Sequence, residues 1–317
     1  MNKKIAAVIV TFNRIELLKL CLAALDKQTH LVDSIIVINN NSKDGTKEFL
    51  DKWRNDRCTS LAKPIVMHLP LNTGGAGGFN RGMKAAIESG HDWVWMMDDD
   101  VVPDKDALQA LVDAARKTSG NAGFYSSMAL DASRQHTVNV PQPDSSPSSS
   151  SYPNWGIYLA DGLIKVETST FVSIFIPKDA VIEAGLPIKE FFIWGDDTEY
   201  TLRLNRQGFS GYWVGHSRVL HLRPGIQGLD IRKEQDPQRI SMYKNLYRNT
   251  VFLKRRYGLD PILFTQNSLI RAIGCLIKFG SIRKFMIIIH GVLSGWFFNP
   301  KIEFPSLSHE APPTQPS

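Results

Sequence analysis

The sequence predicts an α/β protein with a parallel, doubly wound sheet, and three observations lead to this fold class. Short apolar runs alternate with helical segments over residues 4–98 of the 317-residue chain. A polar cluster follows each apolar run, and near Asp236 the pattern gives way to long helical segments that are basic and aromatic. Strands that alternate with helices of this length pair in parallel and place their ligands at the carboxyl ends of the strands.

The first part of the chain holds four expected strands with helices between them. Leucines at helical spacing predict a first helix over residues 15–27, and the loop NNSKDGT opens a second helix that runs through Phe49 and Trp53. A third helix is expected over residues 77–90. The apolar runs predict strands at 4–11, 34–40, 64–70 and 92–98.

The pattern is less regular from about Tyr125 onward, where the alternation is expected to break. Residues 141–153 are rich in Pro and Ser with no apolar period, which predicts a mobile surface loop. A strand entering a helix is expected within 165–185, followed by an acidic loop that begins a helix ending at Gly208. Residues 211–225 predict a strand pair, or a strand and a turn.

Polar residues follow each of the four early strands at the point where the strand ends. Thr11 and Asn13 follow the first strand, residues 39–41 the second, 72–78 the third and 98–100 the fourth. Parallel strands end at the same edge of a sheet, so these four clusters should converge. The binding site is therefore expected at this edge.

Composition and charge are those of a globular protein with an uneven charge distribution. Hydrophobic residues make up 43% and charged residues 21% of the chain. The cysteines Cys21, Cys58 and Cys275 are widely spaced, which fits a reducing, cytoplasmic compartment rather than a disulfide framework. The N-terminal apolar run is too brief for a signal peptide. Residues 201–317 carry 17 Lys or Arg against 6 Asp or Glu, so this region should attract anions.

Three consecutive aspartates, Asp98, Asp99 and Asp100, directly follow the apolar run WVWMM. Like charges at this spacing repel one another and lose hydration when buried, so positive charge should lie nearby. A divalent cation such as Mg²⁺ or Mn²⁺ prefers oxygen ligands and would offset the repulsion. A solvated acidic loop that caps a helix starting near Pro103 is the structural alternative, but the converging polar loops favour a metal site.

The segment LNTGGAGGFNRG, residues 71–82, combines glycines with the start of a helix. Glycines let the backbone approach a ligand closely, and helix N-terminal amides favour phosphate, to which Arg81 could add a contact. A dinucleotide fingerprint is the rival interpretation, but GxGxxG normally follows the first strand and this cluster follows the third. A plain loop also stays open.

The segment FFIWGDDTEY, residues 191–200, places three acids at a helix start, where capping alone would favour them. Trp194 and Phe192 form a partly apolar wall, a setting that can hold a carboxylate as general base beside a sugar ring. His221 precedes the sequence LRPG after an apolar run, and a single histidine can be structural or a ligand.

Taken together, these motifs resemble glycosyltransferase family 2 of the GT-A fold. They are VTFNR, NNNSKDGT, NTGGAGGFNRG, the aspartate triplet, WGDDTEY and His221, in this order over residues 5–225. They look most like bacterial galactofuranosyltransferases, with rhamnosyltransferases close behind. The resemblance implies a Rossmann-like mixed sheet in a catalytic domain at 1–230 and a helical, basic C-terminal region at 231–317.

The resemblance also implies a role for each motif. Asp98, Asp100 and His221 would hold Mn²⁺ or Mg²⁺ on the donor diphosphate, with Asp99 toward the donor ribose or sugar. Asp197 would be the general base that deprotonates the acceptor, and Trp194 and Asp196 would contact the acceptor. The donor pocket would be lined by Thr11, Asn13, Asn39, Gly74, Gly75 and Arg81.

The implied reaction is an inverting transfer from UDP-galactofuranose to a glycan or lipid-linked glycan acceptor of a bacterial surface polysaccharide, such as an O-antigen or capsule. Many relatives have Asp where Asn39 stands, as the uracil-contacting acid, so a rhamnosyltransferase that uses dTDP-rhamnose stays open. A sugar-phosphate nucleotidyltransferase would need a Gly-rich, basic signature after the first strand, which VTFNRIELL lacks.

The C-terminal helical segments are basic and aromatic but too interrupted to span a bilayer, because Lys278, Arg283 and Lys284 break the apolar runs. They could lie on the cytoplasmic membrane face, or pack as a helical subdomain on the core or in a homo-oligomer. A non-catalytic membrane or nucleic-acid binder would leave the acidic half unexplained, so no nucleic-acid partner is expected.

Overall fold

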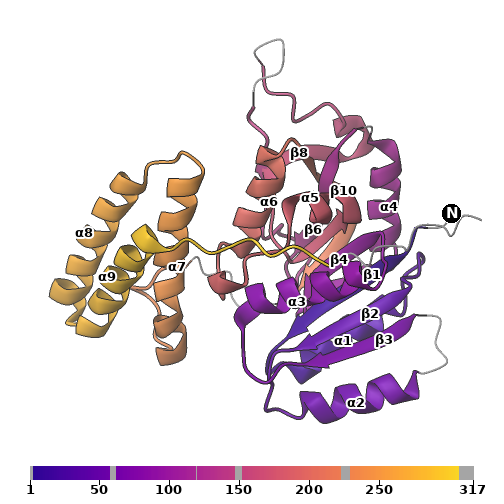
Figure 1. Ribbon diagram of the computed structural model, residues 1–317, viewed down its shortest axis with the longest axis horizontal. Coiled ribbons are helices and arrows are strands. Elements are labelled where there is room, and N and C mark those ends of the chain that lie inside the picture. The colour runs from indigo at the N-terminus through magenta and orange to yellow at the C-terminus, as the bar shows by residue number, and fades with distance from the viewer. Residues whose placement is uncertain (1–2, 58–61, 119, 147–151, 223–228, 307–317) are drawn as a thin grey trace, which may run out of the picture.

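The computed structural model describes residues 3–57, 62–118, 120–146, 152–222 and 229–306 (Figure 1). One mixed sheet of ten strands runs through the larger part of the molecule, in the order β3-β2-β1-β4-β9-β6-β10-β8-β7, with β5 paired to β10. Its strands are β1 (Ile5–Thr11), β2 (Ser34–Asn39), β3 (Lys63–His68), β4 (Trp93–Asp98), β5 (Val101–Pro103), β6 (Ala122–Leu130), β7 (Gln142–Pro143), β8 (Leu163–Thr168), β9 (Ser173–Pro177) and β10 (Ser210–His221).

Helices cover both faces of the sheet, and each face has its own apolar core. Strand β1 is buried along its whole length and alternates between the two cores, as expected for a strand covered on both faces. One core packs against α1 (Ile15–Leu25), α2 (Thr46–Asp56) and α4 (Ala107–Lys117). The other packs against α3 (Gly74–Glu88), α5 (Lys178–Ala184) and α6 (Asp196–Arg206).

The four early strands are confirmed as parallel neighbours, but the sheet as a whole is mixed. Strand β9 runs antiparallel to both β4 and β6, which ends the parallel series. A purely parallel sheet is therefore wrong, and the mixed sheet implied by the family resemblance is confirmed. The polar clusters after β1, β2, β3 and β4 share one edge, because these strands are in parallel register.

The alternation of strands and helices ends after β6, the strand that contains Tyr125, because β7, β8 and β9 follow it with no α-helix between them in the described residues. Three other local expectations are corrected. Near Pro103 the chain forms the short strand β5 before α4 begins at Ala107, and β10 is one long strand instead of a pair. Within the Pro/Ser loop expected at 141–153, β7 pairs with β8, while residues 147–151 lie outside the described part of the chain.

Three long helices follow the sheet and pack beside it as a separate layer, drawn in orange to yellow in Figure 1. They are α7 (Pro237–Arg256), α8 (Pro261–Phe279) and α9 (Ile282–Phe297). Beyond α9 the chain returns to the sheet-containing part, where Glu303 forms ion pairs with Lys84 and Lys189. Among the described residues, no helix is both long and apolar enough to cross a membrane. The expected boundary at 230/231 stays a prediction.

Candidate active site

The structure brings together the three residues expected to hold a metal. One ligand atom from each of Asp98, Asp100 and His221 lies within 4.8 Å of the other two. Asp98 ends β4, Asp100 lies in the turn that follows, and His221 ends β10. The short strand β5 produces this meeting, since Val101 pairs with His221 and the Leu222 amide donates to the Asp100 carbonyl at 2.8 Å.

The imidazole of His221 is held in a defined orientation. Its Nδ1 lies 2.8 Å from the side-chain oxygen of Asn139, and its Nε2 lies 3.3 Å from Asp100 Oδ1. Because the amide oxygen only accepts, Nδ1 is the donor of this hydrogen bond, which leaves Nε2 on the side of the carboxylates, where it could serve as a metal ligand. Histidine ligands of metals typically show this arrangement.

Arg14 supplies the positive charge that the aspartate triplet requires. Its Nη1 donates to Asp100 Oδ2 at 2.8 Å and to Asp99 Oδ1 at 3.3 Å. Asp99 also accepts hydrogen bonds from the Thr11 hydroxyl at 2.7 Å and the Phe12 amide at 3.3 Å. The side chain of Asp99 therefore ties the end of β1 to the triplet, while Asp98 and Asp100 face the site.

Burial and mutual repulsion act on the acidity of these carboxyl groups. Burial, with the nearby charges of Asp100 and Asp99, raises the pKa of Asp98 well above its usual range. Burial also raises the pKa of Asp99, to about 6, although Arg14 and Thr11 oppose the shift. A divalent ion would reverse this tendency, because its charge favours the ionised carboxylates. Two carboxylates and one imidazole form a donor set that suits Mn²⁺, and the imidazole makes it less typical of Mg²⁺.

A second pair of acids faces the same site from the first turn of α6. Asp196 and Asp197 line a cavity of about 250 Å³ together with Asp98, Asp100 and His221. Burial raises the pKa of Asp196 to about 8, with repulsion from Asp197 adding to the shift. Burial also raises the pKa of Asp197, whose Oδ1 accepts from the Thr198 amide at 2.7 Å. A carboxylate with a raised pKa is a better proton acceptor near neutral pH.

The loop before α6 has an unusual backbone that α7 holds in place. Phe192, Trp194 and Gly195 all have positive φ angles, of 64°, 65° and 89°, which only glycine adopts readily. The Asn249 side-chain amide donates to the carbonyls of Phe191, Ile193 and Trp194 at 2.8 to 3.1 Å. These bonds fix the turn that presents Trp194 to the cavity.

The glycine-rich start of α3 packs tightly against its neighbours. A Cβ on Gly74 would lie 2.0 Å from the Phe192 carbonyl oxygen, and one on Gly78 would lie 2.4 Å from Val10. The Ala76 amide donates to the Phe192 carbonyl at 3.2 Å. Gly75 lines the cavity, and a Cβ there would meet nothing within 4 Å. Gly74 and Gly78 therefore allow neighbouring segments to pack closely against this turn, whereas Gly75 leaves space in the cavity.

Comparisons with known proteins agree with this architecture. The family model described as glycosyl transferase family 2 matches residues 6–142. Galactofuranosyltransferase GlfT1 of Mycolicibacterium smegmatis is 30% identical over 281 residues, which are 82% of this chain and 85% of the relative. GlfT1 of Mycobacterium tuberculosis is 35% identical over 129 residues, 38% of each protein.

The chain belongs to glycosyltransferase family 2.

A solved structure supports the fold of this family 2 glycosyltransferase. The crystal structure of GalNAc-T7 with UDP, GalNAc and Mn²⁺ matches with a TM-score of 0.56 at 16% identity, over 82% of this chain. The chain spans about half of that structure, 52% of its length. This similarity shows that the chain has the GT-A fold, which confirms the predicted fold class.

The remaining expected donor residues of the glycosyltransferase lie apart from the cavity. The Asn13 side-chain oxygen accepts from the Lys43 amide, and the Asn39 amide group contacts His68 Nδ1 at 3.0 Å. Thr11 is buried against Asp99. Arg81 lines a different, larger groove on the outer side of α3. Their roles in donor binding stay predictions.

The sequence of the glycosyltransferase did not indicate three residues of this site. Arg14 lies in the VTFNR motif, and its distance from the triplet in sequence concealed their contact. Asn139 adjoins the Pro/Ser segment, which had been interpreted as a surface loop only. Asn249 lies in the basic helical region, where nothing in the periodicity distinguishes it.

Proposed function

We propose that this glycosyltransferase is an inverting, metal-dependent galactofuranosyltransferase. Its donor is UDP-galactofuranose, and its acceptor is a glycan or lipid-linked glycan of a bacterial surface polysaccharide such as an O-antigen or capsule. The observation that carries the proposal is that a metal-ligand triad and an acidic pair line one cavity. Similarity to a galactofuranosyltransferase over 85% of the relative's length supports the choice of sugar.

In the proposed mechanism Asp98, Asp100 and His221 hold the metal, and Arg14 keeps Asp100 in place from the opposite side. Mn²⁺ or Mg²⁺ held by these residues would supply positive charge to the donor diphosphate and to the departing UDP. Asp197 removes the proton from the acceptor hydroxyl, which attacks the anomeric carbon from the face opposite the leaving group. This single displacement inverts the configuration and needs no covalent nucleophile.

Trp194 and Asp196 complete the proposed acceptor side. The indole of Trp194 lines the cavity and packs at 5.1 Å against the ring of Tyr243 on α7, which limits its movement. An aromatic face held in this way suits the apolar face of a sugar ring. Asp196 is buried next to Asp197 and keeps a proton up to a higher pH, so it can donate a hydrogen bond to the acceptor.

We also propose that α8 and α9 attach the protein to the cytoplasmic face of the membrane. Residues 261–297 contain Arg271, Lys278, Arg283 and Lys284 but no Asp or Glu, which complements anionic lipid headgroups. Seven aliphatic side chains of α8 are exposed at helical spacing and form an apolar stripe that can enter the headgroup boundary. They are Ile262, Leu263, Leu269, Ile270, Ile273, Leu276 and Ile277.

Donor turnover tests the proposed reaction. The purified protein is incubated with UDP-galactofuranose, UDP-galactopyranose or dTDP-rhamnose, with Mn²⁺, Mg²⁺ or EDTA, and release of the nucleoside diphosphate is measured. Metal-dependent release of UDP from UDP-galactofuranose alone is expected. Faster turnover of dTDP-rhamnose than of UDP-galactofuranose would refute the proposed donor. Full activity in EDTA would refute the proposed dependence on a metal. Family membership favours glycosyl transfer over the nucleotidyltransferase alternative.

A further inference from the structure

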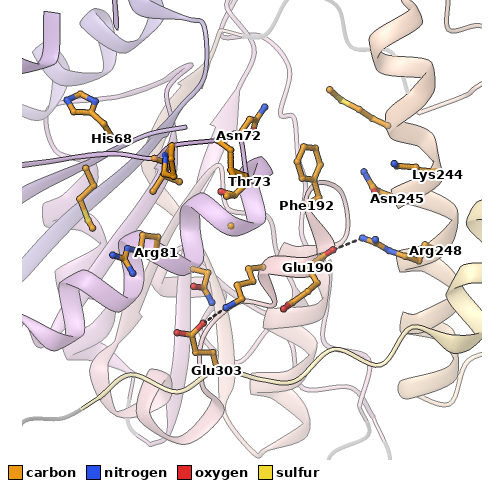
Figure 2. Close-up of a pocket in the computed structure, with 18 of the residues that line it drawn as sticks. His68, Asn72, Thr73, Arg81, Glu190, Phe192, Lys244, Asn245, Arg248 and Glu303 are labelled. Atoms are coloured by element: carbon orange, nitrogen blue, oxygen red, sulfur yellow. Dashed lines mark hydrogen bonds and ion pairs between the residues drawn. The ribbon is translucent and has the colours of Figure 1, made fainter. Parts of the chain in front are cut away.

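A large groove lies on the far side of the loop that borders the active site. It has a volume of about 1170 Å³ and runs between α3 and α7 (Figure 2). Thr73, Gly77 and Phe192 line this groove, whereas Gly75 and Trp194 line the active-site cavity. The first turn of α3 and the loop at 192–194 therefore form one wall with a pocket on each side. The proposed mechanism assigns no role to the groove, although several residues of the 71–82 motif line it.

One face of α7 presents hydrogen-bond donors along this groove. Ser241, Lys244, Asn245 and Arg248 follow one another at helical spacing and all line it. Figure 2 shows the last three of them. Arg248 is already engaged, since its Nη2 donates to the carbonyls of Glu190 and Phe191. The Ser241 hydroxyl donates to the Gln238 carbonyl at 2.6 Å. Lys244 and Asn245 are therefore the two of these four side chains whose polar groups could contact a ligand.

Asn245 is the decisive side chain. It is 96% buried, with a relative exposure of 4%, and it borders the groove. Within the described part of the chain, its side-chain amide makes no hydrogen bond, although its neighbour Asn249 makes three. The amide of Asn245 is not one of the fully buried polar atoms that lack a partner, so it is accessible from the groove and can pair with a ligand there. An amide in this state that borders a cavity is typical of a ligand-binding group.

Charge points to the class of ligand. Lys244 is exposed beside Asn245, and no ion pair of Lys244 occurs among the described residues. The acid Glu303 at the floor is neutralised by Lys84 at 2.7 Å and Lys189 at 3.0 Å, and Glu190 is the other acid of the lining. Arg81 adds a further cation on the α3 side. An ammonium next to an amide donor suits phosphate oxygens.

We propose that the groove binds the phosphate or diphosphate group of the acceptor, with Lys244 and Asn245 as donors to its oxygens. Phe192 packs on the sugar next to that group, and the acceptor continues past the loop toward Trp194. The identity of the ligand as the acceptor rests on the proposed function, whereas the anion site itself does not. This subsite gives the enzyme a means to select acceptors that carry phosphate.

Calorimetric titration with inorganic diphosphate in EDTA tests the anion site, because EDTA removes the metal through which the active-site cavity would bind the same anion. The wild-type protein should bind one diphosphate. Lys244→Glu and Asn245→Leu should weaken binding at least tenfold, while Lys233→Glu, which reverses the charge of an exposed lysine outside the groove, should bind as the wild type does. Absence of binding by the wild type, or equal binding by Lys244→Glu, would overturn the proposal.

Steady-state transfer tests the assignment to the acceptor. Two synthetic acceptors share the same terminal sugars, one as an alkyl diphosphate and the other as a neutral alkyl glycoside. Lys244→Glu should raise KM for the diphosphate about tenfold, with kcat within twofold, and leave KM for the neutral glycoside unchanged. An equal rise for both acceptors would refute the acceptor assignment. Failure of the wild type to use any acceptor, with diphosphate binding intact, would refute the proposed function and support the anion site.

Discussion

The two ends of the molecule use their charged and apolar residues in opposite ways. At the end of β4 the carboxylates of Asp99 and Asp100 are buried and close together, and the partly exposed Arg14 pairs with both of them. On α8 and α9 the charges lie near the surface, and large aliphatic side chains such as Ile277, 77% exposed, face outward. In the first region, folding free energy is lost because carboxylates that repel one another are buried together. In the second region, it is lost because apolar side chains stay exposed to water.

Both departures from an ordinary protein surface indicate binding, but of different kinds. A buried acidic cluster is tolerated where a compact cation can join it, whereas a broad apolar and basic face requires an extended partner. The loop at 191–195 links the acidic cavity to the helical region, because its Trp194 lines the cavity and Asn249 of α7 holds its carbonyls. Changes in either region, or in this connection, should therefore have separable effects.

The largest expected effect is in the acidic region, from Asp197→Asn. Loss of the general base should lower kcat for transfer by about a thousandfold, since such groups contribute roughly 10²- to 10⁴-fold. Binding of UDP in the presence of Mn²⁺ should change little, because Asp197 is not among the proposed metal ligands. The measurement is initial-rate kinetics combined with calorimetric titration of UDP. Transfer within tenfold of the wild-type rate would exclude Asp197 as the base.

A smaller loss is expected when the connection is broken by Asn249→Leu. The carbonyls of Ile193 and Trp194 would lose the Asn249 donor, while Arg248 would still donate to that of Phe191. Trp194 should therefore leave its position, and kcat should fall by roughly a hundredfold. The affinity for UDP with Mn²⁺ should stay within twofold of wild type. Asn267→Leu, at an exposed position of α8, is the control. A rise in KM for the donor alone would contradict the positioning role.

A more moderate effect is expected on the apolar face. Ile277→Glu should weaken partitioning onto anionic phospholipid vesicles by about tenfold, because burial of an aliphatic side chain stabilises by roughly 1.5–3 kcal/mol. Cosedimentation with the vesicles measures this, and transfer to a soluble acceptor should be unaffected. Leu20→Glu changes an exposed leucine of α1 in the same way and should not alter binding. Partitioning equal to wild type would refute the membrane-facing assignment.

The smallest effect concerns the stability of the acidic pair. The pKa of Asp196 is about 8 in the folded protein and 3.8 when unperturbed, so the unfolded chain releases this proton first as pH rises. Ionisation therefore lowers stability progressively between about pH 4 and pH 8. Asp196→Asn removes this cost and should raise Tm by about 3 °C at pH 7.5, with no gain at pH 4.

Thermal denaturation at both pH values checks this stability prediction. Asp179→Asn, an exposed acid in the first turn of α5, should show no comparable gain. Equal stabilisation by Asp196→Asn at both pH values would show that ionisation of this carboxyl is not the cause.

The fold near the active site was largely predictable because it depends on local periodicity. Strands β1 to β4 and their helices follow from short apolar runs, and their shared edge follows from parallel pairing. The meeting of Asp98, Asp100 and His221 rested on the family resemblance and also occurs in the structure. The route to it through β5 could not be predicted, because three residues give no periodic signal.

Residues whose role depends on long-range contacts could not be identified from the sequence. Arg14 meets the triplet over 86 positions and Asn249 reaches Trp194 over 55. The sequence predicts a ligand-binding loop at the GGAGG run, but Gly74 and Gly78 are required because the Phe192 loop and β1 approach the backbone there. The sequence pattern indicated a close approach without identifying the neighbour.

The tight contact between Gly74 and the Phe192 carbonyl limits how the enzyme can be redesigned. A methyl group at position 74 would lie 2.0 Å from the Phe192 carbonyl oxygen, so Ala at this position should displace the loop that carries Trp194. One residue later, Gly75 faces open space in the cavity and admits a side chain. Efforts to engineer a different donor preference would therefore best begin with a small-residue library at position 75.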